Sequence, residues 1–360
     1  MKKMFLALCL PIFIFSSCTK KPTKPRIIIT TDIQACCGDP DDIQSLCHLL
    51  WYADELDIKA IIPEKFGRGE EPGGITAAER VLENYRLDYN DTSNTFQKLA
   101  FPEPDYLLKQ VLQTDPDSSV NKIIAEALAN DKRPLYILVW GNMNIIKDAL
   151  LKAPEIRENI RILTIGTNLR APADGGDGAI PNWNGPGRNR IFGDPAFDEL
   201  WWIENDWGYN SMFMGLTYPE NDDRPTGGRP YEIMNELAKN AGQLGKHLKE
   251  VVSPEMVRWA YYFRAGDTPS VLYLIDPEND PDNPAKGSWA GIFQRPFPEQ
   301  RPNYWTNVTG ESGFDYTDPP NTWKNAEKAI EASYAYALDK REEMYSELLK
   351  KVKKLYGEAD

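Results

Sequence analysis

The sequence predicts an α/β fold in which a mostly parallel central sheet is flanked by helices. Residues 26–31 and 135–140 are apolar runs without polar alternation, which is typical of strands buried on both faces. Between such runs lie segments whose apolar residues recur at about 3.6 positions, as on one face of a helix. Because strands and helices alternate along the chain, we expect parallel strands with helices on both faces of the sheet.

The expected elements follow this alternation. Short apolar runs predict strands over residues 26–31, 58–62, 135–140, 161–166 and 211–216. Amphipathic patterns predict helices over residues 41–56, 75–89, 120–128, 144–151 and 322–355. Two stretches interrupt the rhythm: residues 171–194, with many Gly, Pro, Asp and Asn residues, and residues 276–321, which are rich in Pro and contain Trp. A long irregular loop in a compact domain is more often functional than idle, so the first stretch is a candidate binding loop.

The composition is that of a globular protein, with 41% hydrophobic and 26% charged residues among 360. The formal net charge of −13 argues against a nucleic-acid partner, because phosphate contacts require a basic face. After the N-terminal segment only Cys36, Cys37 and Cys47 remain. They are too few for a disulfide scaffold, and their pairing is left open. A zinc site is not expected, since His48 and His247 are the only histidines.

The N-terminus has the pattern of an export signal. Lys2 and Lys3 precede an apolar stretch too short to span a membrane, and small residues lead to Cys18. This pattern resembles a bacterial lipobox, which implies a signal peptide over residues 1–17 and an acylated Cys18. The alternative is that Cys18 only ends an ordinary signal. We expect a protein of the bacterial cell envelope, on the periplasmic or outer-membrane surface, that contacts membrane through its lipid anchor only.

The remainder of the chain divides into a tether and one domain. Residues 18–25 are polar and contain proline, so they are expected to form a semi-rigid tether. No linker interrupts residues 26–360, which are expected to form one domain. The sequence leaves the oligomeric state open, a homo-oligomer included.

Four carboxylates lie between the first predicted strand and the first predicted helix: Asp32, Asp39, Asp41 and Asp42. The carboxyl edge of an open α/β sheet is where ligands bind. Like charges at this density raise each other's pKa unless a hard cation lies among them. The alternative is that the last three residues only cap the helix and complement its dipole, but that leaves Asp32 at the end of an apolar strand unexplained.

This arrangement resembles the nucleoside hydrolases. In that family an apolar strand ends in Asp, and after a Pro/Gly turn an Asp-Asp pair opens a helix; here the turn carries an insertion. The resemblance implies that Asp32 is a Ca²⁺ ligand that also activates water. It implies Asp42 as a second ligand and Asp41 as an acceptor for a sugar hydroxyl. Asp39 has no clean counterpart in the family.

Two further segments match the same family in order. Residues 135–144 resemble its strand, Gly turn and helix-opening Asn, where a main-chain carbonyl binds the metal, and this implies Trp140 as the donor of that carbonyl. Residues 266–275 resemble its late His-Asp-Pro helix start, which implies Asp267 as the third carboxylate.

Details favour one bacterial branch of the superfamily, the cellulose-binding proteins with a nucleoside-hydrolase-like domain. Residues 39–46 and 266–275, together with Trp289, carry this closer resemblance. One family feature is missing, because Gly266 stands where nucleoside hydrolases place the His that protonates the departing base. His48 is interpreted as packed and His247 as solvated. Nucleosides are therefore not the favoured substrate.

The candidate binding loop falls where related enzymes keep sugar-binding residues. Asn182, Asn184 and Asn189 can donate to and accept from hydroxyls, and Trp183 offers a flat face to a sugar ring. The alternative is a Gly/Asn turn with a packing Trp.

Three hypotheses remain from sequence alone. The first is a Ca²⁺-dependent hydrolase of an N- or O-ribosyl or related glycosidic bond, in which Asp32 activates water. The second is a carbohydrate-binding lipoprotein that does not cleave its small sugar-containing or polysaccharide ligand. The third is a cation that only stabilises the edge of the sheet. We favour the first, because the metal shell is complete in the sequence.

Overall fold

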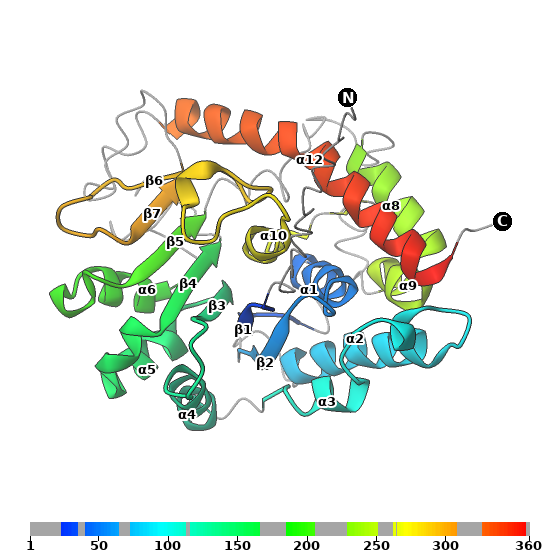
Figure 1. Cartoon of the computed structure of the whole chain (residues 1–360), viewed down its shortest axis with the longest axis horizontal. Coiled ribbons are helices and arrows are strands. Elements are labelled where there is room, and N and C mark those ends of the chain that lie inside the picture. Colours follow the sequence, from blue (N-terminus) through cyan, green and yellow to red (C-terminus); the bar gives the residue numbers. More distant parts are fainter. Residues whose placement is uncertain are drawn as a thin grey trace, which may run out of the picture.

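The computed structural model describes residues 23–34, 40–64, 73–112, 116–165, 185–205, 229–250, 262–263, 265–307 and 326–357 (Figure 1). Several sequence predictions fall outside these residues, namely the signal segment 1–17, Cys18, Cys36, Cys37, Asp39, Asn182, Trp183, Asn184 and the strand expected at 211–216. Among the described residues, no helix combines the length and apolarity needed to cross a membrane.

The centre of the molecule is a seven-stranded sheet with the order β2-β1-β3-β4-β5-β7-β6. Its strands are β1 (Arg26–Thr31), β2 (Asp57–Pro63), β3 (Leu135–Trp140), β4 (Ile160–Ile165), β5 (Trp201–Asn205), β6 (Phe293–Gln294) and β7 (Tyr304–Asn307). All neighbours pair in parallel except β6 and β7, which are antiparallel. The predicted fold class, a mostly parallel sheet flanked by helices, is confirmed.

Helices cover both faces of this sheet (Figure 1). They are α1 (Asp41–Trp51), α2 (Gly73–Asn90), α3 (Pro104–Leu108), α4 (Pro116–Ala127), α5 (Asn144–Lys152), α6 (Gly185–Phe192), α8 (Arg229–Asn240), α9 (Gly242–Glu250), α10 (Pro269–Ile275) and α12 (Ala326–Tyr356). Short 3₁₀ turns are η1 (Phe96–Lys98), η2 (Pro154–Glu158), η4 (Pro195–Phe197) and η6 (Pro284–Lys286).

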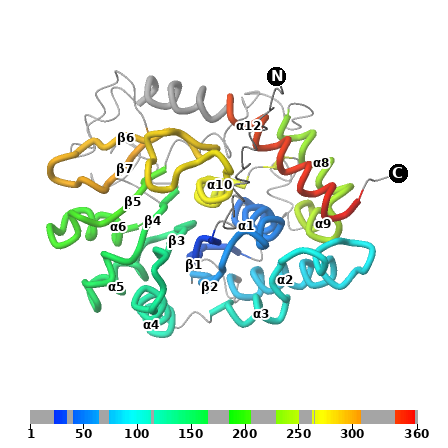
Figure 2. Tube along the Cα trace, in the orientation of Figure 1, coloured from blue at the N-terminus to red at the C-terminus, as the bar shows by residue number. Residues whose placement is uncertain are grey.

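Two apolar cores form because successive residues of a strand point to opposite faces of the sheet. In β1, Ile27 and Ile29 belong to the core under α1, α2, α8, α9, α10 and α12, whereas Ile28 belongs to the core under α4, α5 and α6. All three isoleucines are fully buried. The strand therefore carries an unbroken apolar run, as its sequence predicted. Figure 2 shows the helices on the two faces of the sheet along the Cα trace, with α8 beside the end of α12.

The structure corrects two expectations about secondary structure and adds elements that were not predicted. The stretch 171–194 was expected to be irregular, yet Gly185–Phe192 is helix α6. The stretch 276–321 was also expected to be irregular, yet it contains β6 and β7. Strand β5 and helices α8 and α9 were not predicted. In β5 the last two residues are Glu204 and Asn205, whose buried polar side chains hide the apolar pattern of the strand.

Candidate metal centre

The register of the sheet brings three chain segments to one edge. Thr31, the last residue of β1, pairs with Pro63 of β2 and with Trp140 of β3. The residues that follow them, Asp32, Glu64 and Gly141, therefore emerge side by side at the carboxyl edge. A Cβ atom at Gly141 would lie 3.2 Å from the Cβ of Asp32 and 3.0 Å from Glu64 Oε2, so only glycine fits between the two acids without displacing them.

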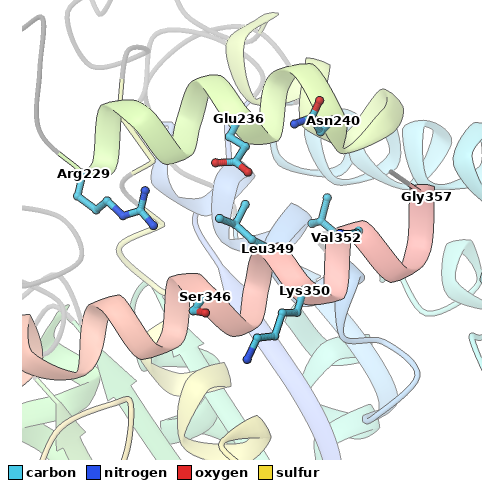
Figure 3. A pocket seen from close by; sticks show the side chains of 9 residues that line it. Arg229, Glu236, Asn240, Ser346, Leu349, Lys350, Val352 and Gly357 are labelled. Carbon is cyan, nitrogen blue, oxygen red and sulfur yellow. The ribbon is translucent and has the colours of Figure 1, made fainter. Parts of the chain in front are cut away.

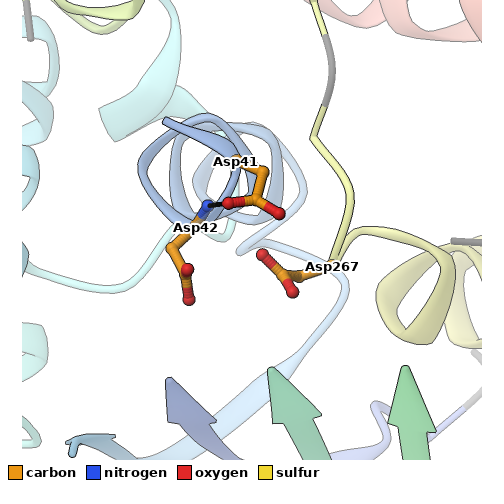
Figure 4. A group of neighbouring side chains, drawn as sticks. All are labelled: Asp41, Asp42 and Asp267. Carbon is orange, nitrogen blue, oxygen red and sulfur yellow. Dashed lines mark hydrogen bonds between the residues drawn. The ribbon is translucent and has the colours of Figure 1, made fainter. Parts of the chain in front are cut away.

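A group of three buried carboxylates lies at the same edge (Figure 4). One oxygen from each of Asp41, Asp42 and Asp267 lies within 4.8 Å of the others. The first two residues open α1, and Asp267 comes two residues before α10. Asp41 Oδ1 accepts from the main-chain N–H of Asp42 (3.1 Å), and Asp42 Oδ1 accepts from the hydroxyl of Thr31. The pair at the start of α1 is thus anchored to the end of β1.

Side chains of α1 and β3 hold Asp267 in place. The main-chain N–H of Asp267 donates to Ser45 Oγ (3.2 Å), one turn beyond the Asp-Asp pair. Ser270 Oγ donates to the carbonyl of Asp267 (2.9 Å) and accepts from Trp140 Nε1 (2.8 Å). These contacts link the end of β3, the start of α10 and the first turns of α1. The convergence of the carboxylates therefore depends on tertiary hydrogen bonds as well as on the sheet.

The electrostatics of the group are unfavourable without a counter-charge. Burial raises the pKa of Asp42 well above its ordinary value, and the charges of Asp267, Asp32 and Asp41 raise it further. Burial also raises the pKa of Asp32, although a side-chain hydrogen bond with Asp42 opposes that shift. A divalent cation would offset both the cost of burying these charges and their mutual repulsion. The donor set fits a hard cation such as Ca²⁺, because all of its atoms are carboxylate oxygens.

Glu64 is a buried acid at this edge that the sequence analysis did not single out. Its Oε2 accepts from the main-chain N–H of Asn142 (3.1 Å) and from the Asn142 side-chain amide. Burial raises its pKa to about 8, and the charge of Asp32 contributes. A usable signal was present in the sequence, because an acid directly after an apolar strand must lie at the same edge as Asp32 if the strands are parallel.

The predicted site residues are distributed as follows. Of the three predicted carboxylate ligands, Asp42 and Asp267 lie in the group of three, and Asp32 lies beside that group, hydrogen-bonded to Asp42; their ligand roles stay predictions. Asp41, expected to accept a sugar hydroxyl, is one of the three buried carboxylates whose oxygens lie within 4.8 Å of one another. Trp140 ends β3 at the correct edge, and its indole contacts Ser270.

Neither histidine belongs to the carboxylate group. His48 is fully buried among Trp51, Tyr52 and Phe263, as expected of a packed residue, and burial lowers its pKa to about 3. The interpretation of His247 as solvated is wrong, since only 2% of it is exposed. It lies on α9, which packs against α1 and α2, and burial lowers its pKa to about 4.

A buried ion pair fixes α6, the helix that carries Asn189. Arg188 and Glu204 are each 1% exposed and are joined by two hydrogen bonds of 2.8 and 2.7 Å. Tyr304 also donates to Glu204. Asn189 Oδ1 accepts from Arg188 (3.4 Å), and its predicted contact with sugar stays a prediction.

A separate groove lies between α8 and α12 (Figure 3). Its lining is mixed in charge and consists of Arg229, Glu236, Asn240, Ser346, Leu349, Lys350, Val352, Lys353 and Gly357. It shares no residue with the carboxylate group, so we do not assign the chemistry of the site to it.

The parallel sheet and the acidic group at its carboxyl edge are features of a nucleoside-hydrolase-like α/β protein. The sequence model of the family "Cellulose-binding Sde182, nucleoside hydrolase-like domain" matches residues 26–293, and the chain belongs to that family. The resemblance found from the three sequence segments is thereby confirmed. A search of curated protein sequences gives no match.

Several solved structures resemble this chain. A nucleoside hydrolase-related hypothetical protein from Saccharophagus degradans, associated with carbohydrate metabolism, is 21% identical, with 88% of this chain and 74% of that one covered and a TM-score of 0.49. The inosine-uridine preferring nucleoside hydrolase of Bacillus anthracis is 14% identical, with 69% and 81% covered and a TM-score of 0.40. The type III effector XopQ, complexed with adenosine diphosphate ribose, is 15% identical, with 86% and 95% covered and a TM-score of 0.45. The family assignment rests on the sequence match.

Proposed function

We propose that this protein binds a sugar-containing ligand at a Ca²⁺ site formed by Asp32, Asp42, Asp267 and the carbonyl of Trp140, and that it hydrolyses a glycosidic bond of N- or O-ribosyl or related type. The observation that carries the proposal is that oxygens of Asp41, Asp42 and Asp267 lie within 4.8 Å of one another, while Asp32 is hydrogen-bonded to Asp42 beside them. Without a cation this convergence would cost stability through burial and repulsion. The cellulose-binding description of the family supports a saccharide as the ligand.

The side chains would divide the work of hydrolysis among them. When bound, the cation supplies Lewis acidity, which makes a nearby water more acidic and orients a sugar diol. Asp32 takes the proton of that water, because burial raises its pKa toward the range of an effective base. Asp41 accepts a hydrogen bond from a sugar hydroxyl, as carboxylates do. Thr31 and Ser45 hold the carboxylate-bearing segments in register.

Binding without cleavage is the second candidate, and one observation favours it. Departure of the leaving group requires a proton donor. Within the described residues, the carboxylate group contains no histidine. His48 and His247 are packed in α1 and α9 instead. In this alternative the same site holds an oligosaccharide or polysaccharide intact.

A binding and turnover assay separates the candidates. The full chain, stripped of metal and reloaded with Ca²⁺, is tested against inosine, uridine, aryl ribosides and cello-oligosaccharides. The hydrolase proposal predicts turnover in the wild type and a loss of at least about 100-fold in Asp32→Asn, with sugar binding retained at saturating Ca²⁺ because Asn keeps one ligand oxygen. Glu158→Gln is the control, because its side chain is 75% exposed and precedes β4 at the opposite edge.

Each contrary outcome has a definite meaning. Sugar binding without turnover in the wild type would favour the carbohydrate-binding alternative. A melting temperature that falls on metal removal, with no sugar bound at any concentration, would reduce the cation to a structural role and contradict both candidates.

The proposed location is the bacterial cell envelope, with Cys18 acylated and the domain held outside the cytoplasm by the tether. Palmitate labelling of the wild type, lost in Cys18→Ser with release of the protein from the membrane fraction, is the expected result. Equal labelling of the two proteins would contradict it.

A further inference from the structure

Glu64 is an acid enclosed at the carboxyl edge of the sheet, beside the candidate metal centre. It follows β2 directly, and its main-chain N–H donates to the carbonyl of Thr31 (2.7 Å). Only 5% of the residue is exposed. Its position is thus set by the backbone of β1.

The two oxygens of this carboxyl have different surroundings. Oε2 accepts from the main-chain N–H and the side-chain amide of Asn142, which fixes the turn between β3 and α5. Oε1 is buried, and among the described residues it has no hydrogen-bond partner. Buried polar atoms without a partner are rare in native proteins and call for a specific explanation.

The carboxyl of Glu64 lies close to Asp32. Gly141 is flanked by both acids, with the Cβ of Asp32 and the Oε2 of Glu64 each within 3.2 Å of the point where a Cβ would lie. Glu64 and Asp32 therefore lie on either side of Gly141 at the same edge of the sheet. The charge of Asp32 is also strong enough at Glu64 to contribute to its raised pKa. A ligand held beside Asp32 comes within reach of Glu64.

We propose that Glu64 contacts the bound sugar directly, with Oε1 hydrogen-bonded to a ring hydroxyl while Oε2 holds Asn142. The inference rests on the proposed function, since the sugar is the ligand of the candidate metal centre. A hydroxyl both donates and accepts, so the contact forms with the carboxyl in either protonation state. The ligand class is a polyhydroxylated sugar with a free hydroxyl next to the groups that Asp41 and the cation engage.

The contact also predicts specificity. A site built to hydrogen-bond a hydroxyl discriminates strongly against an analogue that lacks it, because its own polar group then stays buried and unpaired. Deoxy sugars that lack this hydroxyl are therefore expected to bind at least tenfold more weakly than the parent sugar.

Two substitutions separate the roles of the two oxygens. In Glu64→Gln the amide oxygen can still accept from Asn142, and the amide nitrogen can donate to a sugar hydroxyl. In Glu64→Ala both contacts are lost. We expect Glu64→Gln to keep sugar affinity within about threefold and Glu64→Ala to lose at least about tenfold, as each hydrogen bond is worth roughly that factor.

The test is calorimetric titration of the Ca²⁺-loaded full chain with D-ribose and with cellobiose, and of the metal-free chain with Ca²⁺. Glu158→Gln is the charge-matched control. The expected result is weaker sugar binding in Glu64→Ala with Ca²⁺ affinity within threefold of wild type, while circular dichroism shows that all variants are folded. Rescue by Glu64→Gln completes the pattern.

Two results would overturn the inference while the proposed function stands. One is equal sugar binding by Glu64→Ala and wild type. The other is a parallel loss of Ca²⁺ and sugar affinity, which would make Glu64 a support of the metal centre. If the Ca²⁺-loaded wild type binds neither sugar, that result contradicts the proposed function itself, and the inference falls with it.

Discussion

Replacing Asp42 by Asn should make the metal-free protein more stable and should reduce the stabilisation that the protein gains from Ca²⁺. The substitution removes one charge from the buried group and keeps Oδ1, which accepts from Thr31. Burial and the charges of Asp267, Asp32 and Asp41 raise the pKa of Asp42, so the folded state resists its ionisation. A raised carboxyl pKa means that stability is lost as the pH rises, and the gain from Asn is therefore larger at pH 8 than at pH 5.

The size of the effect follows from the geometry. Two like charges 4.8 Å apart repel by about 3.5 kcal/mol at an effective dielectric constant of about 20. Part of this repulsion is already avoided, because a carboxyl with a raised pKa keeps its proton. We therefore expect metal-free Asp42→Asn to gain about 2 kcal/mol at pH 8. Wild type should recover about 2.7 kcal/mol when free Ca²⁺ is 100 times its dissociation constant, and the variant much less.

Urea unfolding at pH 8, with chelator or with Ca²⁺, measures both effects. Asp88→Asn is the matched control, because Asp88 is a buried acid that accepts from Gln243, Leu244 and Tyr356. It should lose stability equally in both conditions. A chelated Asp42→Asn protein that is less stable than wild type, or an equal response to Ca²⁺ in both, would refute the reasoning.

Further outcomes are expected elsewhere in the molecule. Glu204→Gln leaves Arg188 buried without its counter-charge and should cost about 3–5 kcal/mol in urea unfolding; a cost below about 1 kcal/mol would contradict this. Burial raises the pKa of Glu64 from 4.5 to about 8, so the stability of the metal-free wild type should fall as the pH rises from 4.5 through 8, and Glu64→Gln should flatten that slope. An unchanged slope would be evidence against the shift. Gly187→Ala places a Cβ 2.7 Å from the carbonyl carbon of Met143 and should cost about 1–3 kcal/mol; a neutral effect would show that α6 shifts freely.

The predicted part of the site follows from the topology of the sheet. The runs that end in Thr31 and Trp140 are continuously apolar, which suits a strand buried on both faces. Parallel strands end at one edge, so the chain order alone places Asp32 beside the Asp-Asp pair that opens the next helix. Asp267 needed the family resemblance, because no local pattern connects it with the other acids.

The residues that were missed are those whose surroundings come from distant segments. Glu64 stands after a proline at the end of a strand, and the turn at Gly141 and Asn142, far away in the sequence, packs against it. His247 has lysines nearby in sequence, yet α9 buries it against α1 and α2.

Helix α6 shows the same dependence on distant segments. Its Gly185-Pro186-Gly187 start is typical of a loop, and a buried ion pair with a residue of β5 holds it as a helix. Local periodicity carries no information about such long-range pairs.

The central claim is that acids from separate segments share one bound ion. Titration of the metal-free full chain with Ca²⁺, beside Asp267→Asn, tests it most directly. We predict one ion per chain in the wild type and at least about a tenfold weaker affinity in the variant, since a buried carboxylate ligand is lost. No heat of binding in the wild type, or equal affinity in the two proteins, would contradict the account.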